Sequence, residues 1–77
     1  MAVQVHYQGS VFDLDPTRSD AFWCSFIDET IATVNETGRP LPLGLNLADG
    51  RGAWLHLYPG TPIAVVAPAE ILFHRHD

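Results

Sequence analysis

Residues 41–58 read LPLGLNLADGRGAWLHLY, and this stretch decides the fold. Leucines at positions 41, 43, 45 and 47 alternate with small or polar residues, which is the period of a strand with one buried face. Asp49-Gly50 then forms a hairpin turn, and the alternation resumes after it. We therefore expect two antiparallel strands, Leu41–Ala48 and Ala53–Tyr58. Pro42 cannot donate to a strand ladder, so the first strand begins at an edge or pairs incompletely there.

The segments outside this hairpin also carry strand signals. Val3–Tyr7 alternates apolar and polar residues, and Val11–Leu14 resumes extended structure after a turn at residues 8–10, so we expect an N-terminal hairpin. Downstream, Pro62–Ala67 predicts another strand after a turn at residues 59–61. Ala69–His74 is apolar enough for a final short strand or a docked tail.

One long helix lies between the two hairpins. Asp15 followed by Pro16 predicts its start, with Ser19 as a competing N-cap. Its end is expected near Asn35 or Glu36, where Gly38 provides the C-terminal stop. One face carries apolar residues at helical spacing, and Phe22 and Cys24 widen it into a stripe broader than one sheet face demands. The residues at that spacing are Trp23, Phe26, Ile27, Thr30, Ile31 and Val34.

These elements predict a single α+β domain over residues 1–77. The order is ββ-α-βββ: a mostly antiparallel sheet of about five strands with one long amphipathic helix packed on one face. At 77 residues, a domain of this size buries a core that leaves only about 3–5 kcal/mol of stability. Burial of a face in a dimer or against a partner is therefore expected.

The charge balance narrows the choice of partners. Nine Asp and Glu stand against four Arg, Lys is absent, and the formal net charge is −5. Nucleic-acid binders derive most of their affinity from cationic contacts to phosphates, so direct nucleic-acid binding is not expected. An anionic membrane surface is excluded on the same ground. A negative field favours a basic partner, including proteins that themselves hold nucleic acid.

Cysteine content and hydropathy indicate a compartment. One cysteine excludes an internal disulfide framework. The N-terminal residues lack the basic segment and long apolar run of a secretion signal. No apolar stretch approaches the roughly 20 residues that a membrane span requires. We expect a cytoplasmic protein.

The segment Val11-Phe12-Asp13-Leu14-Asp15-Pro16-Thr17 resembles the first motif of the haloacid dehalogenase-like phosphohydrolases, an apolar strand that ends in Asp-x-Asp-x-Thr. The resemblance covers seven residues. It implies that Asp13 is the nucleophile, Asp15 the general acid–base and Thr17 a phosphate contact, with a bound Mg²⁺ ion.

Several features of the sequence oppose a phosphohydrolase. Phosphoryl transfer needs cations around the equatorial oxygens, and the lysine that the family supplies is absent from this chain. The family's C-terminal acidic motif is also missing, and Pro16 replaces a flexible glycine. The motif strand follows a tight turn, whereas the family places it at the centre of a parallel sheet. We therefore interpret Asp15 as a helix cap and Asp13 as a solvated strand residue, and we expect no enzyme activity and no cofactor.

Two further residue sets invite a chemical interpretation. His74-Arg75-His76-Asp77 contains metal-ligand types, but a terminal tail rarely has the shape of a site, so no metal is expected. Cys24 lies one helical turn from Asp20 and from Asp28, and neighbouring carboxylates disfavour a nucleophilic thiolate. Two alternatives remain for Cys24: a small hydrophobe at the core margin, which we favour, or an intermolecular disulfide across a twofold axis.

The strand 53–58 predicts an aromatic outer face. If Leu55 and Leu57 point to the core, then Trp54, His56 and Tyr58 share the opposite face. Gln4 and His6 join them if the N-terminal hairpin belongs to the same sheet. Such aromatic rows often mark interfaces. The alternative is that residues 71–73 (Ile-Leu-Phe) cover this face.

The sequence predicts that this protein binds another protein and does not catalyse a reaction. We expect a small acidic, non-enzymatic interaction protein that docks on a basic surface of a nucleic-acid-binding protein or complex. It is similar to phage-encoded inhibitors such as anti-CRISPR proteins in size and charge, but no motif carries that similarity. The aromatic face would anchor this partner or form a homodimer. A phosphohydrolase at Asp13 and Asp15 and a structural subunit of a larger assembly are the alternatives. The expected acidic residues are Asp13, Asp15, Asp20, Asp28 and Glu29.

Overall fold

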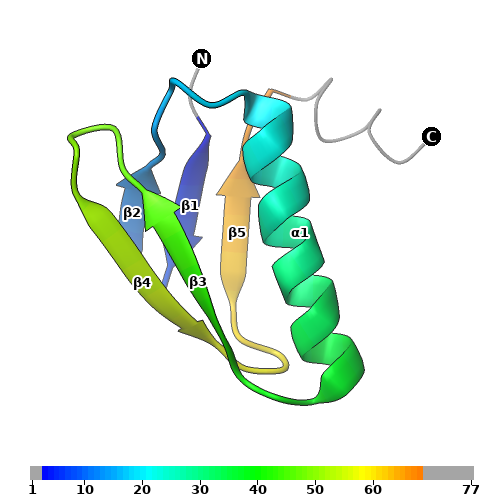
Figure 1. The fold of residues 1–77 in the computed structure, drawn as a ribbon. Helices are drawn as coiled ribbons and strands as arrows, with labels where there is room; N and C mark the ends of the chain where they lie inside the picture. Colours follow the sequence, from blue (N-terminus) through cyan, green and yellow to red (C-terminus); the bar gives the residue numbers. More distant parts are fainter. Residues whose placement is uncertain (1–2, 69–77) are drawn as a thin grey trace.

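A computed structural model describes residues 3–68 and shows one helix packed against antiparallel strands (Figure 1). The α+β class expected from the sequence is confirmed. The segments 69–74 and 74–77, for which a last strand and a polar tail were predicted, lie outside the described residues. The elements in chain order are β1 (Gln4–Tyr7), β2 (Ser10–Asp13), α1 (Asp20–Thr37), β3 (Leu41–Asn46), β4 (Gly52–Leu57) and β5 (Ile63–Val66).

The N-terminal hairpin forms the first sheet together with the last described strand. β1 pairs antiparallel with β2 on one side and with β5 on the other, in the order β2-β1-β5. Gln8 and Gly9 turn the chain between β1 and β2 with φ of 49° and 85°. Two successive positive φ angles are the mark of the tight two-residue turn whose twist matches that of the flanking strands.

The hairpin of residues 41–58 forms the second sheet, with the register that the alternation of leucines predicts. Leu43 lies opposite Leu55, and both are buried. The backbone N–H of Leu47 donates to the Arg51 carbonyl across the turn (2.8 Å). Hydrogen-bonded pairs alternate with non-bonded pairs along an antiparallel ladder. Because Leu47 and Arg51 form a bonded pair, the odd-numbered residues of β3 and β4 bond to each other. The N–H and C=O groups of the even-numbered residues therefore point away from the partner strand. Pro42 is one of these, and its missing N–H therefore costs the β3–β4 ladder nothing.

The single sheet expected from the sequence is wrong: the five strands within residues 3–68 form two sheets. They meet at one isolated antiparallel bridge between Leu14 and Leu47. Two backbone bonds of 2.9 Å flank the bridge, from the N–H of Asp15 to the Asn46 carbonyl and from the N–H of Ala48 to the Asp13 carbonyl. Within residues 3–68, no other strand of one sheet pairs with a strand of the other, and both sheets contribute side chains to the core.

The helix starts later than Asp15-Pro16 would place it. Ser19 is the N-cap of α1, and its hydroxyl accepts a hydrogen bond from the N–H of Phe22 at 3.0 Å. Asp15 therefore does not cap the helix, and the competing cap is the correct one. At the other end, Gly38 adopts φ 71° and donates its N–H to the Val34 carbonyl. This left-handed cap is the expected glycine stop, because a side chain is disfavoured there.

The core lies between the two sheets and α1. Both sheets and the helix contribute to it, and α1 packs against β3. No helix within residues 3–68 is long and apolar enough to cross a membrane. The buried hydrophobic residues are Val3, Val5, Leu14, Trp23, Cys24, Ile27, Val34, Leu43, Leu45, Leu47, Leu55 and Leu57.

Candidate functional site

The outer face of β4 carries exposed aromatic side chains. Leu55 and Leu57 are buried, whereas Trp54 is 66% exposed and Tyr58, just after the strand, is 55% exposed. His56 is exposed between them. The predicted alternation along β4 is therefore confirmed. Large apolar side chains that remain this accessible are candidates for contact with another molecule.

Gln4 and His6 do not join this face, because β1 belongs to the other sheet. Residues 71–73, the segment expected as an alternative cover, lie outside the described residues.

Trp54 lies across the backbone of β3 rather than standing away from it. Its cross-strand partner is Gly44, and a Cβ atom at that position would lie 3.0 Å from the ring atom Cζ3 of Trp54. A side chain on residue 44 would require the indole to shift by a few tenths of an ångström, because such a contact is tighter than nine in ten real Cβ contacts. Gly44 thus allows Trp54 to rest flat on the hairpin, where its outer side stays open to solvent.

The backbone edge of β4 is open over part of its length. The outward-facing N–H and C=O groups of the strand belong to Gly52, Trp54 and His56, by the ladder alternation described above. The Tyr7 hydroxyl donates to the His56 carbonyl at 2.9 Å, which ties the end of β4 to β1. Beyond the strand, the N–H of Tyr58 donates to the Thr61 hydroxyl (2.7 Å). The open part therefore runs from Gly52 to the N–H of His56.

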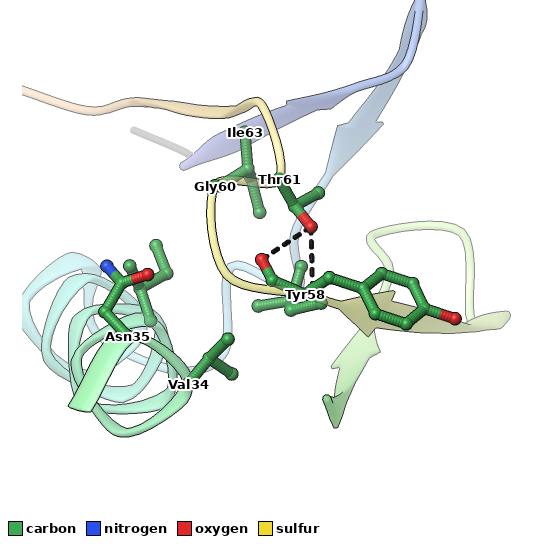
Figure 2. A pocket seen from close by; sticks show the side chains of 8 residues that line it. Val34, Asn35, Tyr58, Gly60, Thr61 and Ile63 are labelled. Carbon is green, nitrogen blue, oxygen red and sulfur yellow. Dashed lines mark hydrogen bonds between the residues drawn. The ribbon is translucent and has the colours of Figure 1, made fainter. Parts of the chain in front are cut away.

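A small cavity of about 140 Å³ lies between the C-terminal half of α1 and the loop from β4 to β5 (Figure 2). Val34 and Ile63 contribute apolar surface, and Asn35 provides a polar amide. Figure 2 shows the Thr61 hydroxyl bonded to both the N–H and the carbonyl of Tyr58, which fixes the loop. Pockets that hold cofactors or drug-sized ligands measure roughly 300–1,000 Å³, so this cavity has room for one side chain.

The outer face of α1 differs from that of β4 in both its charge and its surface shape. Asp28 and Glu29 are exposed and surround a shallow depression together with Ser25 and Ala32. The small side chains lower the surface between the carboxylates, so another molecule can approach the helix backbone closely. Within α1 there are four carboxylates and no Lys or Arg. The four are Asp20, Asp28, Glu29 and Glu36.

The other expected acidic residues belong to separate local structures. Asp20 is half-buried in the first turn of α1, where a negative charge complements the helix dipole. Asp13 accepts a hydrogen bond from the side chain of Gln4 at 2.8 Å. Asp15 accepts bonds from the N–H and the hydroxyl of Thr17 (2.9 and 2.8 Å), which hold the pKa of Asp15 below its usual value. Only Asp28 and Glu29 of the five expected residues share a surface depression.

The segment that resembles the phosphohydrolase motif occupies a different setting from the one that the resemblance implies. β2 is an edge strand of an antiparallel sheet, not the centre of a parallel one. Asp13 and Asp15 are engaged as just described, and Leu14 between them is buried. Within residues 3–68, no group of three or more His, Cys, Asp or Glu side chains is placed to hold a metal ion.

Cys24 lies in the core with 2% of its surface exposed. This burial supports the interpretation as a small hydrophobe and opposes a disulfide to a second copy, because the sulfur cannot reach another chain without opening the core.

With this geometry established, we compared the chain with known proteins. Protein-family models, curated proteins and solved structures gave no match.

Sequence reasoning missed two residues that shape the β4 surface. The role of Gly44 was accessible in principle, because counting outward from the Asp49-Gly50 turn places residue 44 opposite residue 54. Tyr7 carried no such signal, since its bond to the His56 carbonyl joins residues 49 positions apart and depends on how the two sheets are stacked.

Proposed function

We propose that this protein is a small acidic interaction module that docks on a basic surface of another protein through the outer face of α1. The observation that carries the proposal is the pair Asp28 and Glu29 beside Ser25 and Ala32, on a helix that contains no cation. The small residues allow close approach, and the carboxylates supply the attraction.

The net charge supports the same partner class. At −5, the chain repels nucleic acid and anionic surfaces, and it accelerates encounter with positively charged ones. A protein surface that itself holds nucleic acid is rich in Arg and Lys, and it is therefore the kind of target that the α1 face fits. Occupation of such a surface would block the nucleic acid, so the expected role is that of an inhibitor that works without chemistry.

The test uses isosteric neutral variants. The double variant Asp28→Asn/Glu29→Gln removes two charges from the α1 face and keeps side-chain shape. The matched control Asp13→Asn/Asp15→Asn removes two charges outside α1, and Asn can still accept the hydrogen bonds from Gln4 and Thr17, because both bonded carboxylates accept through a single oxygen, Oδ1. Each chain serves as bait in a pull-down from the native host, and basic proteins recovered by the wild type are then titrated against all three.

We expect the α1 variant to bind about tenfold more weakly, with a shallower dependence on salt, because two charge contacts of roughly 0.5–1 kcal/mol each are lost. The control should bind within about twofold of the wild type, since its only effect is on the long-range field. Equal affinity of the α1 variant and the control would contradict the proposal, as would recovery of acidic partners alone.

A further inference from the structure

In the part of the chain that the structure describes, the two sheets have four strand edges, and three of them are protected against pairing with another strand. β2 is four residues long and carries Asp13, and β5 is four residues long and lies between Pro62 and Pro68. β3 contains Pro42, and its edge is partly covered by the chain around Leu14. Short edges, charges, prolines and covering segments are the devices that keep sheets from joining edge to edge.

Among residues 3–68, the contact that covers part of the β4 edge is the bond from the Tyr7 hydroxyl to the His56 carbonyl, and the rest of this edge has none of these devices. The strand is six residues long, contains no proline and no Asp, Glu, Lys or Arg, and leaves backbone groups of Gly52 and Trp54 facing outward. It also belongs to a sheet of only two strands, and a two-stranded sheet gains stability when further strands are added. This edge is therefore suited to accept a strand.

We propose that β4 pairs with β4 of a second copy of this chain, so that the two hairpins form one four-stranded antiparallel sheet. The proposal goes beyond the docking function and does not depend on it, because it uses a different surface. A twofold axis at Trp54 sets the register: Trp54 lies opposite Trp54, and Gly52 lies opposite His56.

This register satisfies both backbone and side chains. All three positions face outward, so each pair can exchange its N–H and C=O bonds across the axis. The His56 carbonyl can accept a second bond beside that from the Tyr7 hydroxyl, because a carbonyl oxygen has two lone pairs. Gly52, which has no side chain, lies opposite the bulky His56. The two Trp54 indoles meet on one face and bury surface that is 66% exposed in the single chain.

Charge also favours a second copy. A chain of net charge −5 repels its own kind wherever carboxylates face one another. The segment from Gly52 to Tyr58 contains no Asp, Glu, Lys or Arg, so two copies can approach there without opposing carboxylates. Antiparallel pairing of identical strands is closed by the twofold axis, which makes the product a dimer.

The first test measures association by sedimentation equilibrium of the full chain. Trp54→Lys places two like charges directly opposite each other and removes the indole contact, so we expect the dimer dissociation constant to rise about a hundredfold. Tyr58→Lys is the matched control: it makes the same chemical change on the same face, but the N–H and carbonyl of residue 58 are already used by Thr61. The control should shift the constant by less than about threefold.

The second test fixes the register. Opposed residues of a hydrogen-bonded antiparallel pair have Cα atoms about 5.5 Å apart. Their Cβ atoms are too far apart for an unstrained disulfide but lie within reach of a short thiol-to-thiol cross-linker. Such a reagent should therefore join two copies of Trp54→Cys into a covalent dimer, whereas Tyr58→Cys should not cross-link. The native Cys24 does not compete, because it is buried. Circular dichroism of each variant verifies that the fold is retained.

Two results would overturn the proposal. One is a wild-type chain that stays monomeric up to high micromolar concentration. The other is cross-linking of Tyr58→Cys as readily as Trp54→Cys, which would show contact through the aromatic face without the paired register.

Discussion

The outer face of α1 and the outer side of β4 are the two surfaces that we propose for contact with other molecules, and they have opposite chemistry. The helix face combines carboxylates with small side chains, whereas β4 combines aromatic rings with an open, uncharged backbone edge. Attraction at the helix is long-range and weakened by salt. At β4 it is short-range and depends on register. A domain of 77 residues can therefore present two independent contacts that are distinguished by salt dependence and by mutation.

The largest effect on stability is expected for a core residue that supports both surfaces. Leu43 is fully buried in β3, the strand that pairs with β4 and contacts α1. Leu43→Ala should lower the free energy of unfolding by about 3 kcal/mol, because it removes buried methyl groups and leaves a cavity. Urea denaturation measures the loss, and both contacts should weaken together. Val11→Ala, at a side chain that is 54% exposed, is the control and should change stability by less than about 0.5 kcal/mol.

A smaller effect should fall on the helix side alone. Ser19→Ala removes the hydroxyl that accepts the N–H of Phe22, so the free energy of unfolding should fall by about 1 kcal/mol. Asp15→Ala is the informative comparison, since Asp15 bonds to Thr17 in the preceding loop and not to the helix. Thermal denaturation followed by circular dichroism should show the larger loss for Ser19→Ala. A larger loss for Asp15→Ala would mean that the helix begins at the earlier residue.

The smallest effect should fall on the β4 side alone. Gly44→Ala introduces a Cβ atom 3.0 Å from the Trp54 ring, and the exposed indole can move away, so stability should change by about 0.5 kcal/mol or less. In a ¹H–¹⁵N spectrum, the indole N–H signal of Trp54 should shift. The signal of Trp23 should stay, because its indole is buried and donates to the Asp15 carbonyl at 3.0 Å. Movement of the Trp23 signal would show that residue 44 communicates with the helix side.

Local features of the fold could be predicted from the sequence because they depend on neighbouring residues. The alternation of leucines around Asp49-Gly50 predicted the β3–β4 hairpin and which of its side chains face the core. Gly38 predicted the end of α1, because its left-handed backbone is a local requirement. The start of the helix was ambiguous between Asp15 and Ser19, since both are good caps and the choice depends on the loop that joins β2 to α1.

The arrangement of the sheets could not be predicted, because periodicity says which side chains are buried and not which strands pair. The two sheets meet at the bridge between Leu14 and Leu47. These residues are far apart in the sequence, and nothing in the sequence around either of them indicates that they pair. The candidate site was more accessible to prediction than the arrangement of the sheets. The exposure of Trp54 follows from the period of its strand, but the grouping of Glu29 with Ser25 and Ala32 could have been found from helical spacing and was not.

Pro42 has a consequence for the size of any assembly. Its ring nitrogen faces the side of β3 that lies away from β4, so a strand arriving there finds no donor at that position. Growth of a sheet through β4 would consequently stop after one addition, with a proline at each outer margin. Pro42, which the β3–β4 hairpin tolerates without loss, would thus prevent further strands from adding. The assembly would remain a discrete complex and would not grow into an open-ended fibril.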